Sequence, residues 1–344
     1  MNINLLEDSQ LSLLRELITD SVKVVIVVHR SPDGDAMGSM LAWGMYLQSM
    51  GKEVTCVIPD AAPDFLLWLP DTNALLRFDK CPDEARAAFA AADLICCLDF
   101  NDLSRTEDVA HAVRDSQARL LLIDHHVAPT LETALSVSRP SLSSTSELVF
   151  RLIWQLGGYD AMTLPMAQCI YCGMMTDTGA FTYNSNSPEL YLIISYLLAK
   201  GIDKDRIYNR VYHNYSPNAI RFRSYLIYRK MRVVPALHAA YFTVTRDEMR
   251  RFRFIKGDLE GVVNIPQKIR KLKLSISLRE DTEHDNVIRV SLRSGNGFHC
   301  RPMAEAFFHG GGHEDAAGGR LECSIKEAEQ VVLRALTAYK DQLQ

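Results

Sequence analysis

Short runs of β-branched and other apolar residues alternate along the first half of the chain with longer segments of helical periodicity. Residues 24–28, 53–58, 94–98 and 120–123 are too short for helices and are bounded by polar or turn-forming residues. Residues 5–17, 36–50, 148–156 and 163–175 instead carry apolar side chains at helical spacing. This alternation predicts an α/β fold built from βαβ units, with a doubly wound and mostly parallel sheet.

The pattern changes in the second half. Residues 188–200 and 218–231 have helical periodicity, whereas residues 239–244, 275–278 and 287–292 are predicted strands of a second sheet. We therefore expect an N-terminal domain over residues 1–190, a helical linker over 191–235 and a smaller C-terminal α/β domain over 236–344.

The first apolar run ends in a histidine and two carboxylates, His29, Asp33 and Asp35. Ligands bind in open α/β sheets just beyond the carboxyl ends of the strands, where these residues would lie. Crowded carboxylates repel each other, and a divalent cation removes that repulsion. The alternative is an Asx turn that caps a helix near residue 36. An isolated Asp-Gly-Asp does not distinguish the two.

The same arrangement recurs three times, which favours a metal site. Asp99 ends the run at 94–98, the run at 120–123 leads into Asp124, His125 and His126, and Asp177 follows the apolar helix at 163–175. A mixture of imidazole and carboxylate ligands suits manganese, zinc or iron better than calcium.

Five sequence segments in this order resemble the DHH/DHHA1 phosphoesterases, and the NrnA-like oligoribonuclease and pAp-phosphatase branch in particular. They are HRSPDGDAMGS (29–39), the strand before Asp99, DHH (124–126), DTGAF (177–181) and GGGHEDAAGG (310–319). The resemblance covers nearly the whole chain. It implies a catalytic DHH domain, a substrate-binding DHHA1 domain and an active site in the cleft between them.

The resemblance also implies two divalent ions, which we expect to be Mn²⁺. It assigns one ion to His29, Asp33 and Asp99, and the other to Asp35, Asp99, His125 and Asp177. Asp99 would bridge the two ions. His126 would contact the phosphate or protonate the leaving oxygen, and Asp124 would orient the histidine pair. A hydroxyl in the segment 143–147 would support His125 or His126.

The glycine-rich segment is expected to bind substrate through Gly310, Gly311, Gly312 and His313. Consecutive glycines let backbone N–H groups converge on an anion, and a helix starting at residue 313 or 314 would add its dipole. Arg293 matches the family's phosphate-binding arginine. Relatives often have a glycine where this chain has His309, and the effect of this histidine on the loop is open.

Composition adds three constraints. The 344 residues are 47% hydrophobic and 23% charged, as in a globular protein. No apolar run approaches the ~18 residues of a membrane span, so we expect a cytoplasmic protein without membrane contact. Cys169 and Cys172 form a CxxC without a second pair, which favours packing over zinc or redox chemistry.

The net charge of −4 hides an asymmetry. Residues 202–279 contain 18 Lys and Arg against 6 Asp and Glu, a local net charge of +12 that leaves −16 elsewhere. A basic segment can hold phosphates. Arginines on a solvated helix face are the alternative.

The resemblance therefore implies a hydrolase that degrades short RNA (nanoRNA) to 5′-mononucleotides by metal-activated water, with pAp phosphatase activity as a further candidate. A soluble phosphodiesterase for cyclic or linear dinucleotides and a non-catalytic nucleotide sensor are the alternatives. The sequence does not rank these substrates. It also leaves open the direction of exonucleolytic attack and whether the protein forms a homodimer.

Overall fold

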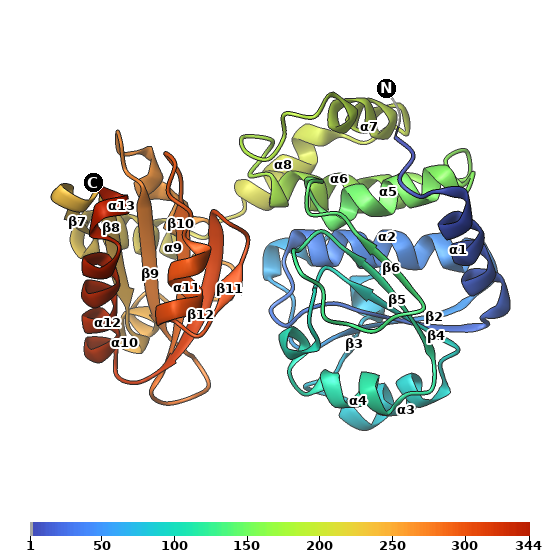
Figure 1. The fold of residues 1–344 in the computed structure, drawn as a ribbon, viewed down its shortest axis with the longest axis horizontal. Helices are drawn as coiled ribbons and strands as arrows, with labels where there is room; N and C mark the ends of the chain where they lie inside the picture. Colours follow the sequence, from blue (N-terminus) through green and yellow to red (C-terminus); the bar gives the residue numbers. More distant parts are fainter. Residues whose placement is uncertain (1–2) are drawn as a thin grey trace. The chain divides into compact units, whose positions relative to one another are not determined.

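A computed structural model of the chain describes residues 3–344. By internal packing the chain divides into two compact units that meet in sequence at Asn214 and Tyr215 (Figure 1). Part of the predicted linker, including Ile193 and Val211, packs into the core of the first unit, and Phe222 packs into the second. The predicted domain boundaries at residues 190 and 235 remain predictions. So does the predicted active-site cleft between the two domains.

A mostly parallel sheet was predicted for the first unit, and every pair of its described strands is parallel. Its strand order within residues 3–344 is β3-β2-β1-β4-β5-β6. The order reverses between β1 and β4, and ligands bind in doubly wound sheets at such a switch point. The strands are β1 (Lys23–Val27), β2 (Glu53–Ile58), β3 (Leu76–Arg77), β4 (Leu94–Leu98), β5 (Arg119–Asp124) and β6 (Leu135–Ser138).

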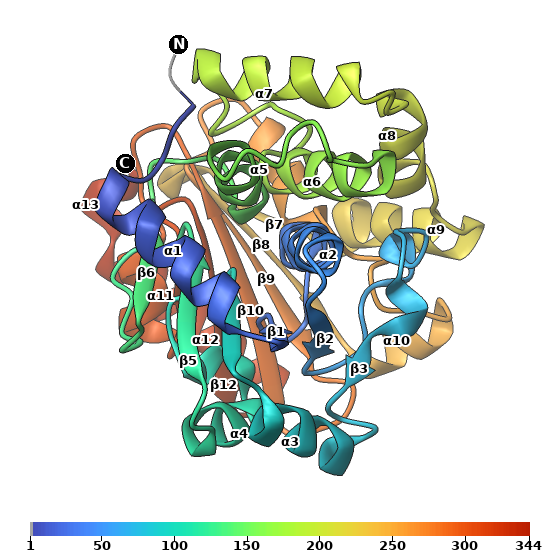
Figure 2. The same ribbon diagram turned by 90° about the vertical axis from the view of Figure 1, so that its right-hand side faces the viewer.

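Helices cover both faces of this sheet (Figures 1 and 2). Val24 and Ile26 of β1 join the core beneath α1, α2, α5 and α6, whereas Val25 and Val27 face α3 and α4. Burial on both faces explains the continuous apolar run of β1, and each such side chain contributes roughly 1.5–3 kcal/mol. The helices are α1 (Asp8–Asp20), α2 (Gly34–Ser49), α3 (Pro82–Ala91), α4 (Val109–Asp115), α5 (Thr145–Gln155), α6 (Leu164–Asp177), α7 (Pro188–Ala199) and α8 (Lys204–Tyr212), with short 3₁₀ turns η1 (Asp64–Leu66), η2 (Thr72–Ala74) and η3 (Leu103–Thr106).

The second unit has a mixed sheet in the order β11-β12-β10-β9-β8-β7. Only the β8–β9 pair is parallel among the described strands of this sheet. The strands are β7 (Arg232–Val234), β8 (Ala239–Val244), β9 (Leu274–Glu280), β10 (Val287–Ser294), β11 (Gly311–Gly312) and β12 (Ala316–Glu322).

Helices lie on both faces of the second sheet as well. Tyr241 of β8 faces the core formed with α11 and α12, and Phe242 faces α9, α10 and η6. The predicted smaller α/β domain is therefore confirmed. Its helices are α9 (Pro217–Tyr225), α10 (Arg246–Arg251), α11 (Arg301–Phe307), α12 (Ile325–Ala338) and α13 (Lys340–Leu343), with a π-helical turn η4 (Leu226–Lys230) and 3₁₀ turns η5 (Pro235–Leu237) and η6 (Val262–Lys268).

The glycine-rich segment differs from prediction. No helix begins at residue 313 or 314, because the chain turns there and β11 and β12 pair as an antiparallel hairpin. The His313 N–H donates across this turn to the carbonyl of Ala316. A helix dipole is therefore not available to this loop.

Residues 3–344 show where the CxxC cysteines lie and how long and apolar the helices are. Cys169 and Cys172 are buried in α6, and burial raises the pKa of the Cys172 thiol to about 12. Their burial fits the predicted packing role. Within residues 3–344 no helix is both long enough and apolar enough to span a bilayer.

Candidate metal centre

Histidine and aspartate side chains of the first unit gather at the carboxyl ends of β1, β4 and β5, and at the last residue of α6. Sequence reasoning anticipated all of them. The side chains form three groups whose ligand atoms lie within 4.8 Å of one another. These groups are His29, Asp33 and Asp99; Asp35, His125 and Asp177; and Asp99, Asp124 and His126.

Asp99 lies between two histidines and turns one carboxylate oxygen toward each. Its Oδ2 is 3.5 Å from Nε2 of His29, and its Oδ1 is 3.7 Å from Nε2 of His125. The residue is buried at the end of β4 with φ of +64°, a left-handed conformation uncommon outside glycine. Such strain persists where the surrounding structure demands it, and it is frequent at functional sites.

Asp33 fits both roles that the sequence left open, a helix cap and a metal ligand. Its Oδ1 accepts hydrogen bonds from the N–H groups of Asp35 and Ala36 at 3.0 and 3.1 Å, which caps α2. Its Oδ2 lies 4.0 Å from Nε2 of His29. The helix-cap interpretation is thus confirmed for one oxygen, while the other faces the candidate metal group.

Two of the histidines are oriented by backbone carbonyls. Nδ1 of His29 lies 2.8 Å from the carbonyl oxygen of Arg30, and Nδ1 of His125 lies 3.3 Å from that of Leu142. Both rings therefore turn Nε2 toward carboxylates; for His125 the nearest is Oδ2 of Asp177, at 3.3 Å. Metal-binding histidines typically donate their second ring N–H in this way.

His126 is held differently. Its Nδ1 lies 2.7 Å from Oδ1 of the buried Asp124, so Asp124 orients this ring. Burial, the Arg105 guanidinium and the other two histidines hold the pKa of His126 well below its usual range. At neutral pH the ring is therefore neutral in this arrangement, and Nε2 carries a lone pair when Nδ1 donates to Asp124.

The amino end of α5 supports two carboxylates. The N–H groups of Thr145 and Ser146 donate to Asp35 at 2.6 and 2.8 Å. The Thr145 hydroxyl donates to Oδ1 of Asp99 at 2.9 Å. The expectation that hydroxyls of this segment support His125 or His126 is wrong for Thr145, since it holds aspartates instead.

A buried ion pair fixes the start of α5. Glu147 accepts hydrogen bonds from the N–H and hydroxyl of Ser143 at 2.9 and 2.7 Å. Its other oxygen accepts from Nε and Nη2 of Arg151 at 2.9 and 2.7 Å. The turn that carries Thr145 is thereby tied to the body of the helix.

The electrostatics of the cluster favour a cation. Burial and the neighbouring charges of Asp35 and Asp33 raise the pKa of Asp99 well above its usual value. Burial alone would lower the pKa of His125, but surrounding aspartates, Asp177 first, raise it to about 9. Excess negative charge is thus concentrated in a buried site, and a divalent ion would offset it.

Arg105 is a neighbour that the sequence did not reveal. It lies in η3 after β4, is half-buried, and its charge acts on the pKa values of His29 and His126. An arginine in a polar loop carries no sequence pattern that would mark it as a neighbour of a metal site. Thr145 carries only the signature of a helix start, which does not mark it as such a neighbour either.

The predicted substrate loop lies in the second unit. Arg293 of β10 is in register with Ala316 of β12, so it flanks the hairpin that carries Gly310, Gly311, Gly312 and His313. The N–H groups of Gly310 and His313 donate to the carbonyls of Ala304 and Ala316, so neither is available to an anion.

Backbone geometry explains two features of this loop. A Cβ on Gly310 would lie 1.8 Å from the carbonyl oxygen of Gly318, so only glycine fits there. His309 has φ of +47°, the left-handed region that favours glycine. A glycine at position 309 would adopt this conformation without the cost that a histidine incurs.

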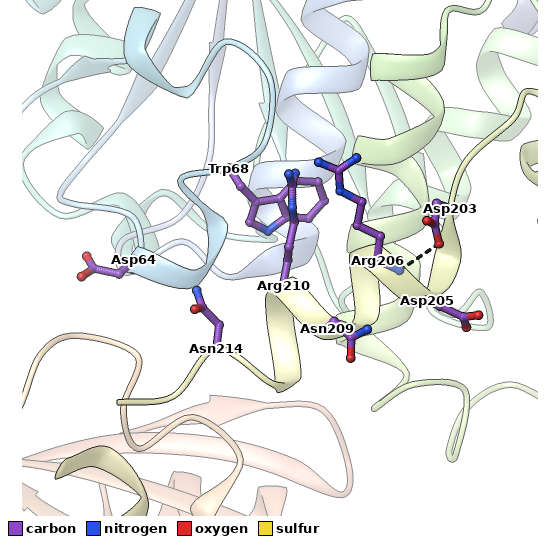
Figure 3. Close-up of a pocket in the computed structure, with 8 residues that line it drawn as sticks. All are labelled: Asp64, Trp68, Asp203, Asp205, Arg206, Asn209, Arg210 and Asn214. Atoms are coloured by element: carbon purple, nitrogen blue, oxygen red, sulfur yellow. Dashed lines mark hydrogen bonds between the residues drawn. The ribbon is translucent and has the colours of Figure 1, made fainter. Parts of the chain in front are cut away.

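A separate open depression of about 680 Å³ lies in the first unit between η1 and α8 (Figure 3). The Arg210 guanidinium lies 4.9 Å from the centre of the Trp68 ring. Asp203, which also lines the depression, caps α8 by accepting from the Arg206 N–H at 2.9 Å. None of the candidate metal ligands lines it, so it is not part of the centre.

Both units of the chain resemble known protein domains. The profile of the DHH family, N-terminal domain, matches residues 23–174, and that of the DHHA1 domain matches residues 238–342. A Thermus thermophilus protein named bifunctional oligoribonuclease and PAP phosphatase NrnA is 27% identical over 322 residues, 93% of this chain and 90% of that protein.

Solved structures extend the comparison. The crystal structure of an exopolyphosphatase-related protein from Bacteroides fragilis superposes with a TM-score of 0.92 at 44% identity, over 98% of each chain. RecJ from T. thermophilus, solved in complex with Mn²⁺, superposes with a TM-score of 0.57 at 13% identity, over 100% of this chain and 56% of RecJ. The RecJ likeness concerns the fold alone.

Proposed function

The chain belongs to the DHH phosphoesterase family, with a DHHA1 domain after the DHH domain, and within that family we propose that it hydrolyses short oligoribonucleotides to 5′-mononucleotides. We further propose that it removes the 3′-phosphate of pAp. Both reactions break the bond between phosphorus and a ribose 3′ oxygen. One centre can therefore perform both, and the relative from T. thermophilus is named for both.

The observation that carries the proposal is the position of Asp99. One oxygen faces the group of His29 and Asp33, and the other faces the group of His125. A carboxylate shared in this way suits two cations that lie side by side. Two-metal sites of this kind are widespread among enzymes of phosphoryl transfer.

The donor set fits divalent metal ions. Carboxylate oxygens converge with two Nε2 atoms whose rings are fixed by backbone carbonyls. We propose Mn²⁺, because mixed nitrogen and oxygen donors suit it. When bound, two such ions would lower the pKa of a water molecule and neutralise charge that develops on the phosphoryl oxygens.

The remaining residues act on the proton and the substrate. Hydrolysis forms one phosphorus–oxygen bond to water and breaks another, so the departing 3′ oxygen must gain a proton. We assign this proton to Nε2 of His126, with Asp124 holding Nδ1, and the proton released by the attacking water passes to solvent, from which His126 is reprotonated. A neighbouring phosphoryl anion raises the low pKa of His126 and favours its protonated form. Arg293 and the hairpin residues Gly311 and Gly312 are assigned to a substrate phosphate.

A turnover panel tests the proposal. Purified protein with Mn²⁺ is supplied with a diribonucleotide, pAp and a cyclic dinucleotide, and the products are separated by chromatography. We expect mononucleotides from the first and AMP from the second. Turnover of the cyclic dinucleotide alone would move the assignment to a phosphodiesterase. Nucleotide binding without turnover of any of the three would support a sensor.

A further inference from the structure

The second unit exposes a basic surface along α9. Between Tyr215, where this unit begins, and Asp247 the chain has six Lys and Arg residues and no acidic residue. Phe222 and Leu226 turn into the core, so α9 and η4 present their other side to solvent. We call the exposed set the α9 basic face; it consists of Arg221, Tyr228, Arg229, Arg232 and Arg251.

The arginines of this face carry uncompensated charge. Within residues 3–344, none of the four forms an ion pair with a carboxylate. Cations beside the face are neutralised instead, since Lys230 pairs with Glu248 at 2.6 Å and Arg246 pairs with Asp285. Unpaired, solvent-exposed guanidinium groups on one surface attract phosphates. When such groups neutralise the phosphates of a nucleic acid, counterions condensed on the nucleic acid are released.

Aromatic rings accompany these charges. Tyr228 is 90% exposed on the π-helical turn η4, between the core residue Leu226 and Arg229. Arg251 lies over the rings of Tyr225 and Phe252, at 5.8 and 5.4 Å from their centres. An exposed ring beside guanidinium groups is the arrangement on which nucleic-acid bases stack. Phosphate contacts alone would not explain an exposed tyrosine.

The face is separate from the glycine-rich hairpin. β7, which begins with Arg232, and β11 are opposite edges of the six-stranded sheet. Five strand spacings of ~4.8 Å separate these edges, about 24 Å in all. A stacked strand rises ~3.4 Å per nucleotide, so roughly seven nucleotides are needed to reach from one to the other. A dinucleotide at the hairpin therefore falls short of Arg232, the residue of the α9 basic face that lies on β7.

We propose that the α9 basic face is a second RNA-contacting surface, which binds the phosphates of a single strand and stacks a base on Tyr228. The proposed function enters only in the choice of RNA as the polyanion. This surface would hold the part of a longer strand that extends beyond the hairpin. It takes no part in the hydrolysis itself.

Binding of the full chain to fluorescent RNA in EDTA tests the proposal without hydrolysis. A 12-nucleotide strand and a dinucleotide are titrated against the wild type and a double variant, Arg221→Ala with Arg229→Ala. We expect the 12-mer affinity to fall roughly tenfold and its salt slope to decrease by about 1.4, since each phosphate contact of a single strand contributes ~0.7. Dinucleotide binding should not change.

Matched controls distinguish the loss of the α9 basic face from the loss of any two positive charges. Lys326→Ala with Arg334→Ala removes the same charge from exposed positions of α12, and it should leave 12-mer affinity within twofold of the wild type. Tyr228→Ala should weaken 12-mer binding at least fivefold, whereas Tyr228→Phe keeps the ring and should bind normally. Circular dichroism melts verify that each variant is folded.

Three results would overturn the proposal. The first is an equal loss in the α12 control, and the second is an equal loss for the dinucleotide. The third is unchanged RNA binding while the double variant loses sedimentation with phosphatidylserine vesicles, which would make the face a lipid contact. Dinucleotide turnover with Mn²⁺ is measured separately, so failure of the proposed function is distinguishable.

Discussion

The hydroxyl of Thr145 donates a 2.9 Å hydrogen bond to Oδ1 of Asp99. The N–H of the same residue donates to Oδ2 of Asp35 at 2.6 Å. One fully buried residue thus holds two carboxylates that we assign to metal binding. Partners of this kind fix the direction of a ligand's lone pairs, and we regard Thr145 as a positioning residue.

Thr145→Val should weaken Mn²⁺ binding about 10- to 100-fold, because it removes the donor to Asp99 with little change in side-chain shape. Thr145→Ser keeps the hydroxyl and should bind Mn²⁺ nearly as the wild type does. Calorimetric titration without substrate measures both. Unchanged affinity in the valine variant would show that the hydroxyl does not position Asp99.

Asp99→Asn should lower kcat on the order of 10² or more, since in the proposed centre its carboxylate would serve both ions. Asp33→Asn is the matched comparison, because asparagine caps helices as well as aspartate does and α2 should keep its cap. We expect the smaller loss there. Equal losses in steady-state assays of a diribonucleotide would argue against bridging.

Chelation should abolish hydrolysis, and Mn²⁺ should restore it better than Mg²⁺ or Ca²⁺ because imidazole nitrogen is among the proposed donors. The measurement is the rate of mononucleotide release after dialysis against EDTA and addition of each metal. Full activity in metal-free buffer would contradict the two-metal centre.

Arg293→Ala should raise KM roughly ten- to hundredfold for a substrate with a second phosphate, since a charge-assisted contact contributes about 1.5–3 kcal/mol. Arg293 is half-buried and its Nη1 donates to the carbonyl of Leu292 at 2.9 Å, which leaves other donors of the guanidinium for a ligand. Bis-p-nitrophenyl phosphate, which lacks the second phosphate, should be hydrolysed at the wild-type rate. An equal loss on both substrates would make Arg293 structural.

Asp281 should make the second unit more stable at neutral than at acidic pH. Burial would raise the pKa of this carboxyl, but hydrogen bonds from the N–H of Glu283, from Arg289 and from His284 lower it strongly. With a depressed folded-state pKa, the contribution is present above the unfolded value of ~3.9 and is lost as pH falls through the folded value.

Asp281→Asn should therefore destabilise the protein by about 1–3 kcal/mol at pH 7. The difference between variant and wild type should begin to shrink at pH 3, below the unfolded value of ~3.9, because the unfolded chain then takes up a proton that folded Asp281 does not bind. Urea unfolding at both pH values, followed by circular dichroism, measures it. A difference that is the same at both pH values would assign the loss to packing.

Much of the candidate centre was predictable because its ligands follow apolar strands directly in the chain. In a parallel sheet every strand ends at the same edge, so His29, Asp99 and His125 must gather once β1, β4 and β5 form. Burial of these strands on both faces explains their continuous apolar runs. The family resemblance rests on the same segments.

Other features depend on contacts between residues far apart in sequence. Thr145 binds Asp35 across 110 positions, and its helix-start signature could not say which carboxylate it would meet. Arg105 acts on His29 and His126 only because η3 folds back beside β1, where its carbonyl accepts from the Arg30 N–H at 2.8 Å.

By itself, the sequence determined which elements form and which chemical groups stand at their ends, because periodicity and strand burial are local properties. Only the tertiary structure decided how those groups are paired. It joined Asp124 to His126, and it turned the expected helix after Gly312 into the hairpin of β11 and β12. Side-chain partners and strand pairing are decided by the packing of the whole unit, which no local pattern encodes.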